Sequence, residues 1–135
     1  MTLVNRETAE LDFARFAECM DLDFEEANMT EEDLDGFRKQ KRVVLSAIQS
    51  GHVTVDDAGQ PTVHLKFPIG DLQSVTFREP TGATFLAMDQ KKKNQDVSKT
   101  FAMIQAMLKV NPGTLSDMQN RDLRVVQAIG LLFLG

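Results

Sequence analysis

The sequence predicts an α+β fold, mainly α by content, in which a small antiparallel β-hairpin sheet packs with C-terminal helices. A two-helix N-terminal extension precedes the sheet. Apolar residues recur every three or four positions before residue 50 and after residue 96, which is the spacing of amphipathic helices. Between these segments, short alternating runs flank "DDAGQP" and "PIGD", whose composition is typical of tight turns.

The 135 residues suffice for one compact unit with its own core. We divide it into an acidic helical extension, residues 1–51, and a hairpin-plus-helix segment, residues 52–135. The extension holds two predicted helices, one from Thr8 to about Met20 and one from Glu31 to Gln49. The sequence "TEED" at residues 30–33 resembles a capping box, and "SG" at residues 50–51 ends the second helix.

The second segment begins with the sheet. Predicted strands cover residues 52–55, 62–67 and 72–77, each with alternating apolar and polar side chains. Helices are predicted at residues 81–90, 97–110 and 121–134, with a short helical turn near residues 115–118.

Charge is spread unevenly along the chain. Residues 1–35 carry twelve Asp and Glu side chains against two Arg, whereas the remaining residues carry eight acids against thirteen bases. The acidic third would repel nucleic acid, and only Arg121 and Arg124 supply positive charge to the last two helices. We therefore expect no nucleic-acid partner.

Three features bear on location. Cys19 is the single cysteine, which argues against a disulfide framework and suits a reducing cytoplasm. The start "MTLVNRETAE" lacks the basic and apolar regions of a signal peptide. The longest apolar stretch, "VVQAIGLLFLG", is shorter than the roughly 20 residues that span a bilayer. We expect a soluble intracellular protein with no membrane partner.

One acidic stretch has the spacing of a calcium loop. Asp21, Asp23, Glu25 and Glu32 occupy positions 1, 3, 5 and 12 of such a loop between two helices. The sixth position is Glu26, where the loop needs glycine for its sharp turn. The four matching positions make a calcium-responsive adaptor an alternative function. An acidic linker beside a helix N-terminus accounts for the same residues.

Catalytic motifs are missing from the sequence. His52 and His64 fall on opposite hairpin strands and are predicted to face each other, but two histidines without a third ligand make a weak metal site. Phosphate-binding glycine loops, Gly-x-Ser-x-Gly and Cys-x-x-Cys do not occur. We expect a protein that is not an enzyme and needs no cofactor or metal.

The stretch "REPTG", Arg78, Glu79, Pro80, Thr81 and Gly82, separates the last predicted strand from the first later helix. Proline disfavours helix at the residue before it and suits the first turn of the helix that follows. Threonine can cap exposed N–H groups, and glycine permits close packing. These residues predict a rigid structural corner, with the arginine free to pair with a carboxylate.

The later helices carry apolar residues on opposite sides. In a domain of this size, both helices cannot easily be buried on all sides. Each Phe or Leu left exposed loses the stabilising free energy of about 1.5–3 kcal/mol that its burial would contribute. We therefore expect self-association or a protein partner that contacts Met103, Met107, Val110, Ile129 and Phe133. The competing interpretation is that the helices are sandwiched in the core and that methionine fills gaps there.

Three segments follow one another in the second half of the chain: "VHLKFPI", "SVTFREPTGATFLAM" and "FAMIQAMLKVNPGTLSDMQNRDLRVVQAIGLLFLG". In this order they resemble the tail assembly chaperones of tailed bacteriophages and prophages. The resemblance covers roughly residues 62–135. Residues 1–60 resemble an extension found in some longer tail assembly proteins. The resemblance assigns Arg78, Pro80, Thr81 and Gly82 to the structural corner of the family.

What this resemblance implies is a non-enzymatic function. Such proteins bind the long helical tape measure protein, keep it soluble and promote assembly of the tail tube. They act in the cytoplasm of the bacterial host and are absent from the mature virion. The resemblance also implies contact with the tail tube protein and a frameshifted longer form of the chaperone itself. A virion structural protein, such as a tail or head-completion component, is the other alternative.

Overall fold

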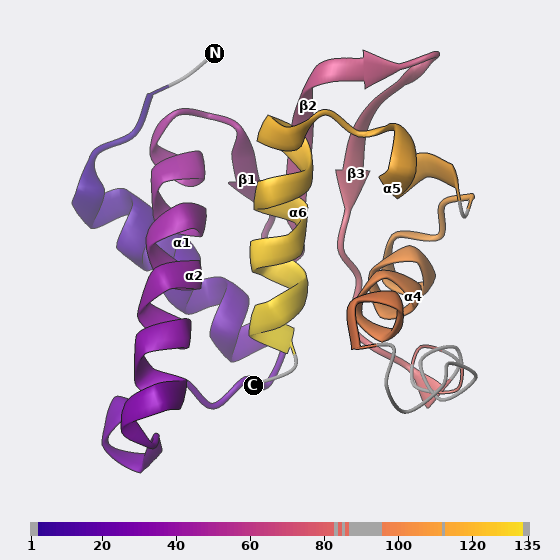
Figure 1. Ribbon diagram of the computed structural model, residues 1–135. Coiled ribbons are helices and arrows are strands. Elements are labelled where there is room, and N and C mark those ends of the chain that lie inside the picture. The colour runs from indigo at the N-terminus through magenta and orange to yellow at the C-terminus, as the bar shows by residue number, and fades with distance from the viewer. Residues whose placement is uncertain (1–2, 83, 85, 87–95, 112, 134–135) are drawn as a thin grey trace.

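The computed structural model describes residues 3–82, 84, 86, 96–111 and 113–133 (Figure 1). The elements are α1 (Arg6–Cys19), the 3-10 turn η1 (Glu26–Asn28), α2 (Glu31–Gln49), β1 (Val53–Val55), β2 (Pro61–Ile69), β3 (Leu72–Thr76), α4 (Asp96–Leu108), α5 (Gly113–Asp117) and α6 (Asn120–Phe133). This mainly helical architecture around a small antiparallel sheet confirms the predicted fold class. No helix among the described residues combines the length and the apolar character that a membrane crossing requires.

The first two helices begin at side-chain caps. Asn5 Oδ1 accepts a hydrogen bond from the Thr8 N–H at 2.7 Å, so α1 starts two residues before its predicted position. Thr30 Oγ1 accepts from the Asp33 N–H at 3.2 Å, and α2 has its predicted bounds. Both caps satisfy backbone donors that have no partner inside the helix.

The three described strands form an antiparallel sheet in the order β1-β2-β3. Val63 on the central strand pairs with Val53 on one side and Val75 on the other, and all three side chains are buried. Alternate residues of β2 therefore face the core, as its period of two requires. The pairing of β2 with β3 shifts register between His64 and Ile69.

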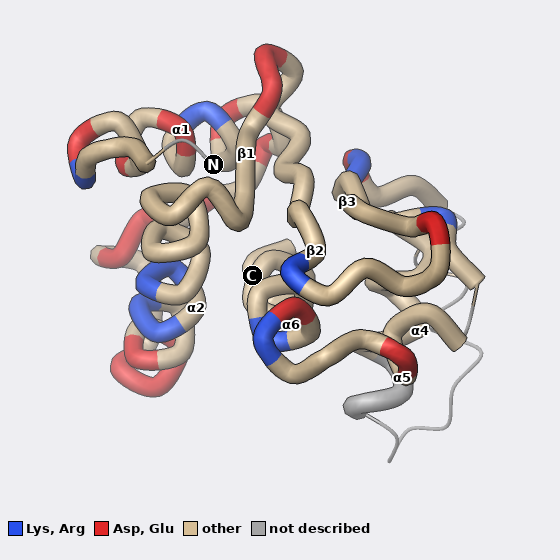
Figure 2. The backbone as a smooth tube through the Cα atoms, turned by 90° about the horizontal axis from the view of Figure 1, so that it is seen from above, with Lys and Arg blue, Asp and Glu red and all other residues tan. Residues whose placement is uncertain are grey.

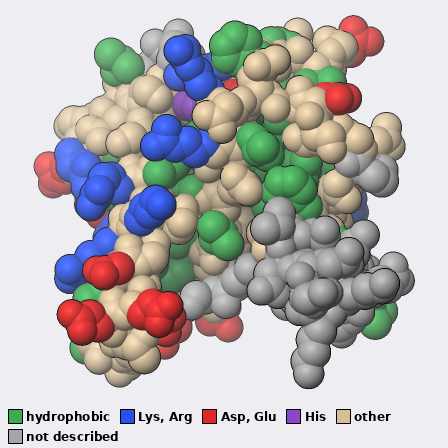
Figure 3. Space-filling view, in the orientation of Figure 1, with side chains coloured by type: hydrophobic (Ala, Val, Ile, Leu, Met, Phe, Trp, Pro, Cys, Tyr) green, Lys and Arg blue, Asp and Glu red, His purple; other side chains and the backbone are tan. Residues whose placement is uncertain are grey.

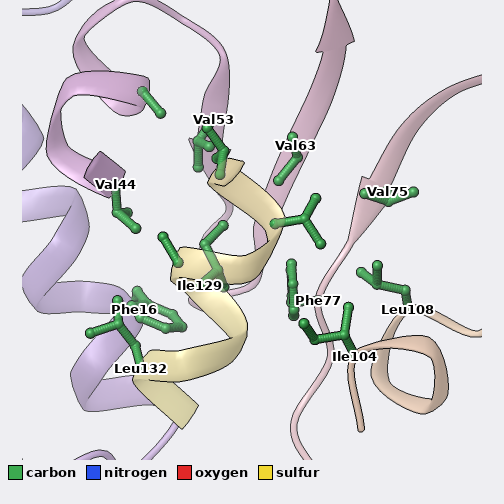
Figure 4. Close-up of a cluster of buried hydrophobic side chains, with 14 of the residues drawn as sticks. Phe16, Val44, Val53, Val63, Val75, Phe77, Ile104, Leu108, Ile129 and Leu132 are labelled. Atoms are coloured by element: carbon green, nitrogen blue, oxygen red, sulfur yellow. The ribbon is translucent and has the colours of Figure 1, made fainter. Parts of the chain in front are cut away.

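Helix α6 lies at the centre of the molecule, with α2 on one side, α4 on the other and the central strand β2 packed against it (Figures 1 and 4). The ring of Phe133 is 5.4 Å from that of Phe16 on α1 and 6.0 Å from that of Phe77 beyond β3, measured between centroids. The two predicted segments thus share one hydrophobic core. Such ring contacts add about 0.5–1.5 kcal/mol each beyond the area they bury.

Gly130 allows α6 to approach α4 closely, and its replacement by alanine should destabilise the fold. A Cβ at this position would lie 2.6 Å from both Cδ1 and Cγ1 of Ile104, whose side chain is fully buried. Overpacking costs about 1–3 kcal/mol, which exceeds the helix propensity of up to about 1 kcal/mol that alanine gains over glycine. We expect Gly130→Ala to lower the free energy of unfolding, measured by urea denaturation, by about 1 kcal/mol.

Gly36→Ala is the matched control for Gly130→Ala. Gly36 lies within α2, and nothing stands within 4 Å of a Cβ added there. Alanine should therefore stabilise this helix by about 0.5–1 kcal/mol. If both substitutions stabilised the protein, close packing at Gly130 would be refuted.

Candidate functional site: a hollow beside the hairpin

An open hollow of about 460 Å³ lies between the β2–β3 turn and the link from α4 to α5. Its walls include three half-buried apolar side chains, Ile69, Leu72 and Val110. Lys109 and Asp117 also line it, both exposed and of opposite charge. Figure 3 shows hydrophobic side chains at the surface beside α6, over β3 and toward α5. The volume and the mixed lining suit an apolar side chain from a polypeptide.

Two sharp reversals of the backbone form this hollow. Gly70 turns the hairpin with a φ of 59°, a conformation that glycine adopts without strain. Lys109 ends α4 with a φ of 55°, and the Val110 N–H then donates to the Gln105 carbonyl at 3.3 Å. This left-handed ending satisfies a carbonyl of the last helical turn. It directs the chain so that Val110 lines the hollow with the hairpin residues Ile69 and Leu72.

Most of the residues predicted to contact a partner lie in the core instead. Met103, Met107 and Ile129 are buried, and Phe133 is half-buried between the rings of Phe16 and Phe77. The prediction that these residues form exposed faces is therefore wrong. The physical reason is that α6 has packing partners on both sides, so its two apolar faces are covered within one chain. Val110 is the predicted residue that lines an open surface.

The predicted corner connects β3 to a helical segment as expected. The structure places Gly82, Thr84 and Leu86 in helical conformation, whereas Thr81 precedes the helical residues. Residues 83, 85 and 87–90 of the predicted helix lie outside the described ones. The capping differs from the prediction, because Thr84 Oγ1 accepts from the Thr81 N–H at 3.1 Å. Thr84 is buried, so it also anchors the corner in the interior.

The other two residues of the corner are at the surface. Arg78 and Glu79 are both exposed. Across the ranges that the structure describes, Arg78 pairs with no carboxylate. The ion pair considered for the corner is therefore not present among them, and the backbone and Thr84 hold the corner.

The acidic loop does not gather its carboxylates. Asp23 Oδ1 accepts from the Glu25 N–H at 3.0 Å, which fixes a local turn. Within the described part of the chain, no group of three or more His, Cys, Asp or Glu side chains is placed to hold a metal ion. The four residues Asp21, Asp23, Glu25 and Glu32 therefore do not form a calcium cage in this structure.

Glu26, which stands at the glycine position of that loop, has a different role. Its carboxylate accepts from Arg38 Nε at 3.1 Å and so ties η1 to α2. This hydrogen bond lowers the pKa of Glu26 and raises the pKa of Arg38. Both side chains are exposed, so the pair adds little to stability.

The structure contains a buried His–Asp pair that the sequence did not predict. His52 Nε2 lies 2.9 Å from Asp122 Oδ1, and both side chains are buried. His64 is exposed and contacts Thr54 Oγ1 at 2.8 Å, so the two histidine side chains do not face each other as predicted. The backbone does pair them, because the His64 N–H donates to the His52 carbonyl.

Comparison with protein-family models, curated proteins and solved structures finds no match to this chain. The described residues form a hollow of mixed polar and apolar lining beside the hairpin, a strand-to-helix corner and a buried His–Asp pair.

Proposed function

We propose that this protein is a phage tail assembly chaperone that binds the tape measure protein, keeps it soluble and promotes tail tube assembly in the host cytoplasm. Two findings support the proposal. Residues 62–135 carry the strand, corner and helix order that the resemblance implies. The hollow lies within this same segment, which supports placing the contact with the partner there.

The hollow is the observation that carries this proposal. A long apolar helical protein stays in solution only if its exposed side chains are covered, and each buried Leu or Phe contributes about 1.5–3 kcal/mol. Ile69, Leu72 and Val110 offer apolar contact, while Lys109 and Asp117 can pair with charges that flank the bound side chain. No catalytic step is needed, and we propose that the protein acts without a cofactor.

Polar substitution in the hollow should abolish solubilisation of the partner. The test is co-expression with the long helical protein encoded next downstream, followed by affinity capture and size exclusion. We expect the partner to be soluble only with the wild-type chain. For Leu72→Asp and Val110→Asp, the amount of co-purified partner should fall about tenfold or more, since each change removes an apolar contact worth about 1.5–3 kcal/mol.

Leu11→Asp is the matched control for these substitutions. Leu11 lies on α1 and is 65% exposed, outside the residues that line the hollow. It should leave co-purification unchanged, and circular dichroism of each variant checks that the fold is retained. A wild-type chain that neither binds nor solubilises the partner would refute the chaperone function. Detection of the chain in purified virions would instead indicate a structural protein.

A further inference from the structure

A continuous groove runs along one face of the molecule between α2 and α6. Three open hollows of about 460, 360 and 320 Å³ follow one another along it. Arg42 and Arg124 line both the first and the second, while Gln40 and Leu131 line both the second and the third. We call this surface the α2–α6 face. None of the residues that line the hollow beside the hairpin belongs to it.

One end of the α2–α6 face is basic. Arg42 of α2, Lys66 of β2, and Arg121 and Arg124 of α6 line the first hollow, and all four side chains are exposed. Figures 2 and 3 show Lys and Arg gathered where α2, β2 and the start of α6 meet. Among the described residues, none of these four cations forms an ion pair. Such a cluster is unusual in a chain with a net charge of −5.

The opposite end of the face is acidic. Glu32 and Asp33 line the third hollow, in the first turn of α2, and they too are exposed. Within the described part of the chain, neither of them forms an ion pair. The ten positions from Glu32 to Arg42 span about 15 Å along the helix, so the two ends cannot pair within one chain.

The middle of the face combines apolar and amide side chains with one further cation, the exposed Lys39. Leu131 is 38% exposed there, beside the half-buried Gln40, Val43 and Gln127. Suppose that a two-fold axis passes through this middle, perpendicular to the groove. It would place a second copy against the face with its two ends in the reverse order. The basic end of each copy would then meet the acidic end of the other, and the two Leu131 side chains would meet near the axis. The two ends of the face are therefore complementary in charge, while Lys39 lies between them.

We propose that a second copy of this chain covers the α2–α6 face and forms a two-fold dimer held by these reciprocal charge contacts. Helix α2 is about 28 Å long and a pair of helices is about 20 Å wide, which is the scale of the smaller protein–protein interfaces. The dimer should dissociate on dilution and weaken with added salt. This inference does not depend on the chaperone function.

Charge reversal and its rescue test the dimer. Sedimentation velocity of the full chain, from about 1 µM to about 1 mM, should show a monomer–dimer equilibrium. The basic-end variant Arg42→Glu/Arg124→Glu and the acidic-end variant Glu32→Lys/Asp33→Lys should each raise the dissociation constant about tenfold or more, because like charges would then face each other. An equimolar mixture of the two variants should recover dimers, since every contact is again between opposite charges.

Two further variants complete the design. Arg6→Glu/Arg78→Glu makes the same change in net charge outside the face and should leave the dissociation constant unchanged. Leu131→Asp should weaken the dimer without altering either charged end. A wild-type chain that stays monomeric at the highest concentration overturns the proposal, as does a mixture of the two variants that fails to associate. Dimers that persist in the basic-end variant would place the interface elsewhere and overturn it too.

Discussion

Replacing Asp122 with alanine should lower the free energy of unfolding by about 3–5 kcal/mol, one of the largest effects that a single substitution can have in this chain. The Asp122 side chain is fully buried in the first turn of α6. Its Oδ1 accepts hydrogen bonds from His52 Nε2 and from the Lys66 N–H, both at 2.9 Å. Its Oδ2 accepts from the Phe67 N–H at 3.1 Å.

The two backbone donors explain the size of this effect. Lys66 and Phe67 lie where the pairing of β2 with β3 shifts register, and the carboxylate serves as acceptor for both N–H groups. Alanine would leave both groups, and the ring of His52, without this acceptor. Both backbone hydrogen bonds are partly buried, and a hydrogen bond to a carboxylate contributes about 1.5–3 kcal/mol. Asp122 thus joins α6, β2 and the residue before β1.

Urea denaturation of Asp122→Ala and Asp122→Asn measures this role. The asparagine side chain keeps one acceptor oxygen but turns an NH₂ group toward at least one donor, so we expect an intermediate loss of about 1–3 kcal/mol. Asp117→Ala is the control, because Asp117 is exposed on the neighbouring helix α5. A loss for Asp122→Ala no larger than that of the control would show that the carboxylate does not hold the strand.

The fold followed from local signals, which is why it could be predicted. Helix α2 has its predicted bounds because Thr30 caps one end and Ser50–Gly51 closes the other. Both signals are local, since each lies within a few consecutive residues. The strands followed from alternation and turn composition in the same way. The corner differed in its capping, because threonines three residues apart can cap one another in either direction.

The buried position of Asp122 depends on contacts between residues that are distant in the sequence, and the sequence did not predict it. In "NRDLR", Asp122 looks like an ordinary acidic residue in the first turn of a helix, where the dipole favours it. It is buried only because β2 passes beside that turn, 56 positions away along the chain at Lys66. The two apolar faces of α6 were recognised, but covering both within one chain requires α1, α2, the sheet and α4 together.

Gly59→Ala should be the second large loss, about 2–5 kcal/mol of unfolding free energy, because it adds overpacking to backbone strain. Gly59 is buried in the β1–β2 turn with a φ of 79°, a left-handed conformation that costs other residues about 1–2 kcal/mol. A Cβ there would overlap the Cβ of Cys19 and lie 3.0 Å from the Arg15 carbonyl, so α1 would have to move away.

Movement of α1 would also break the contacts that attach this helix to the hairpin. Arg15 donates from its guanidinium to the Val55 carbonyl at 2.7 Å and to the Asp56 carbonyl at 3.0 Å. Gly70→Ala is the matched control, since Gly70 has a φ of 59° but nothing within 4 Å of an added Cβ. It should lose only the strain energy of about 1–2 kcal/mol. The difference between the two alanine variants, measured by urea denaturation, therefore reports the close contact of α1 with the hairpin. Equal losses would mean that α1 is held by its apolar face alone.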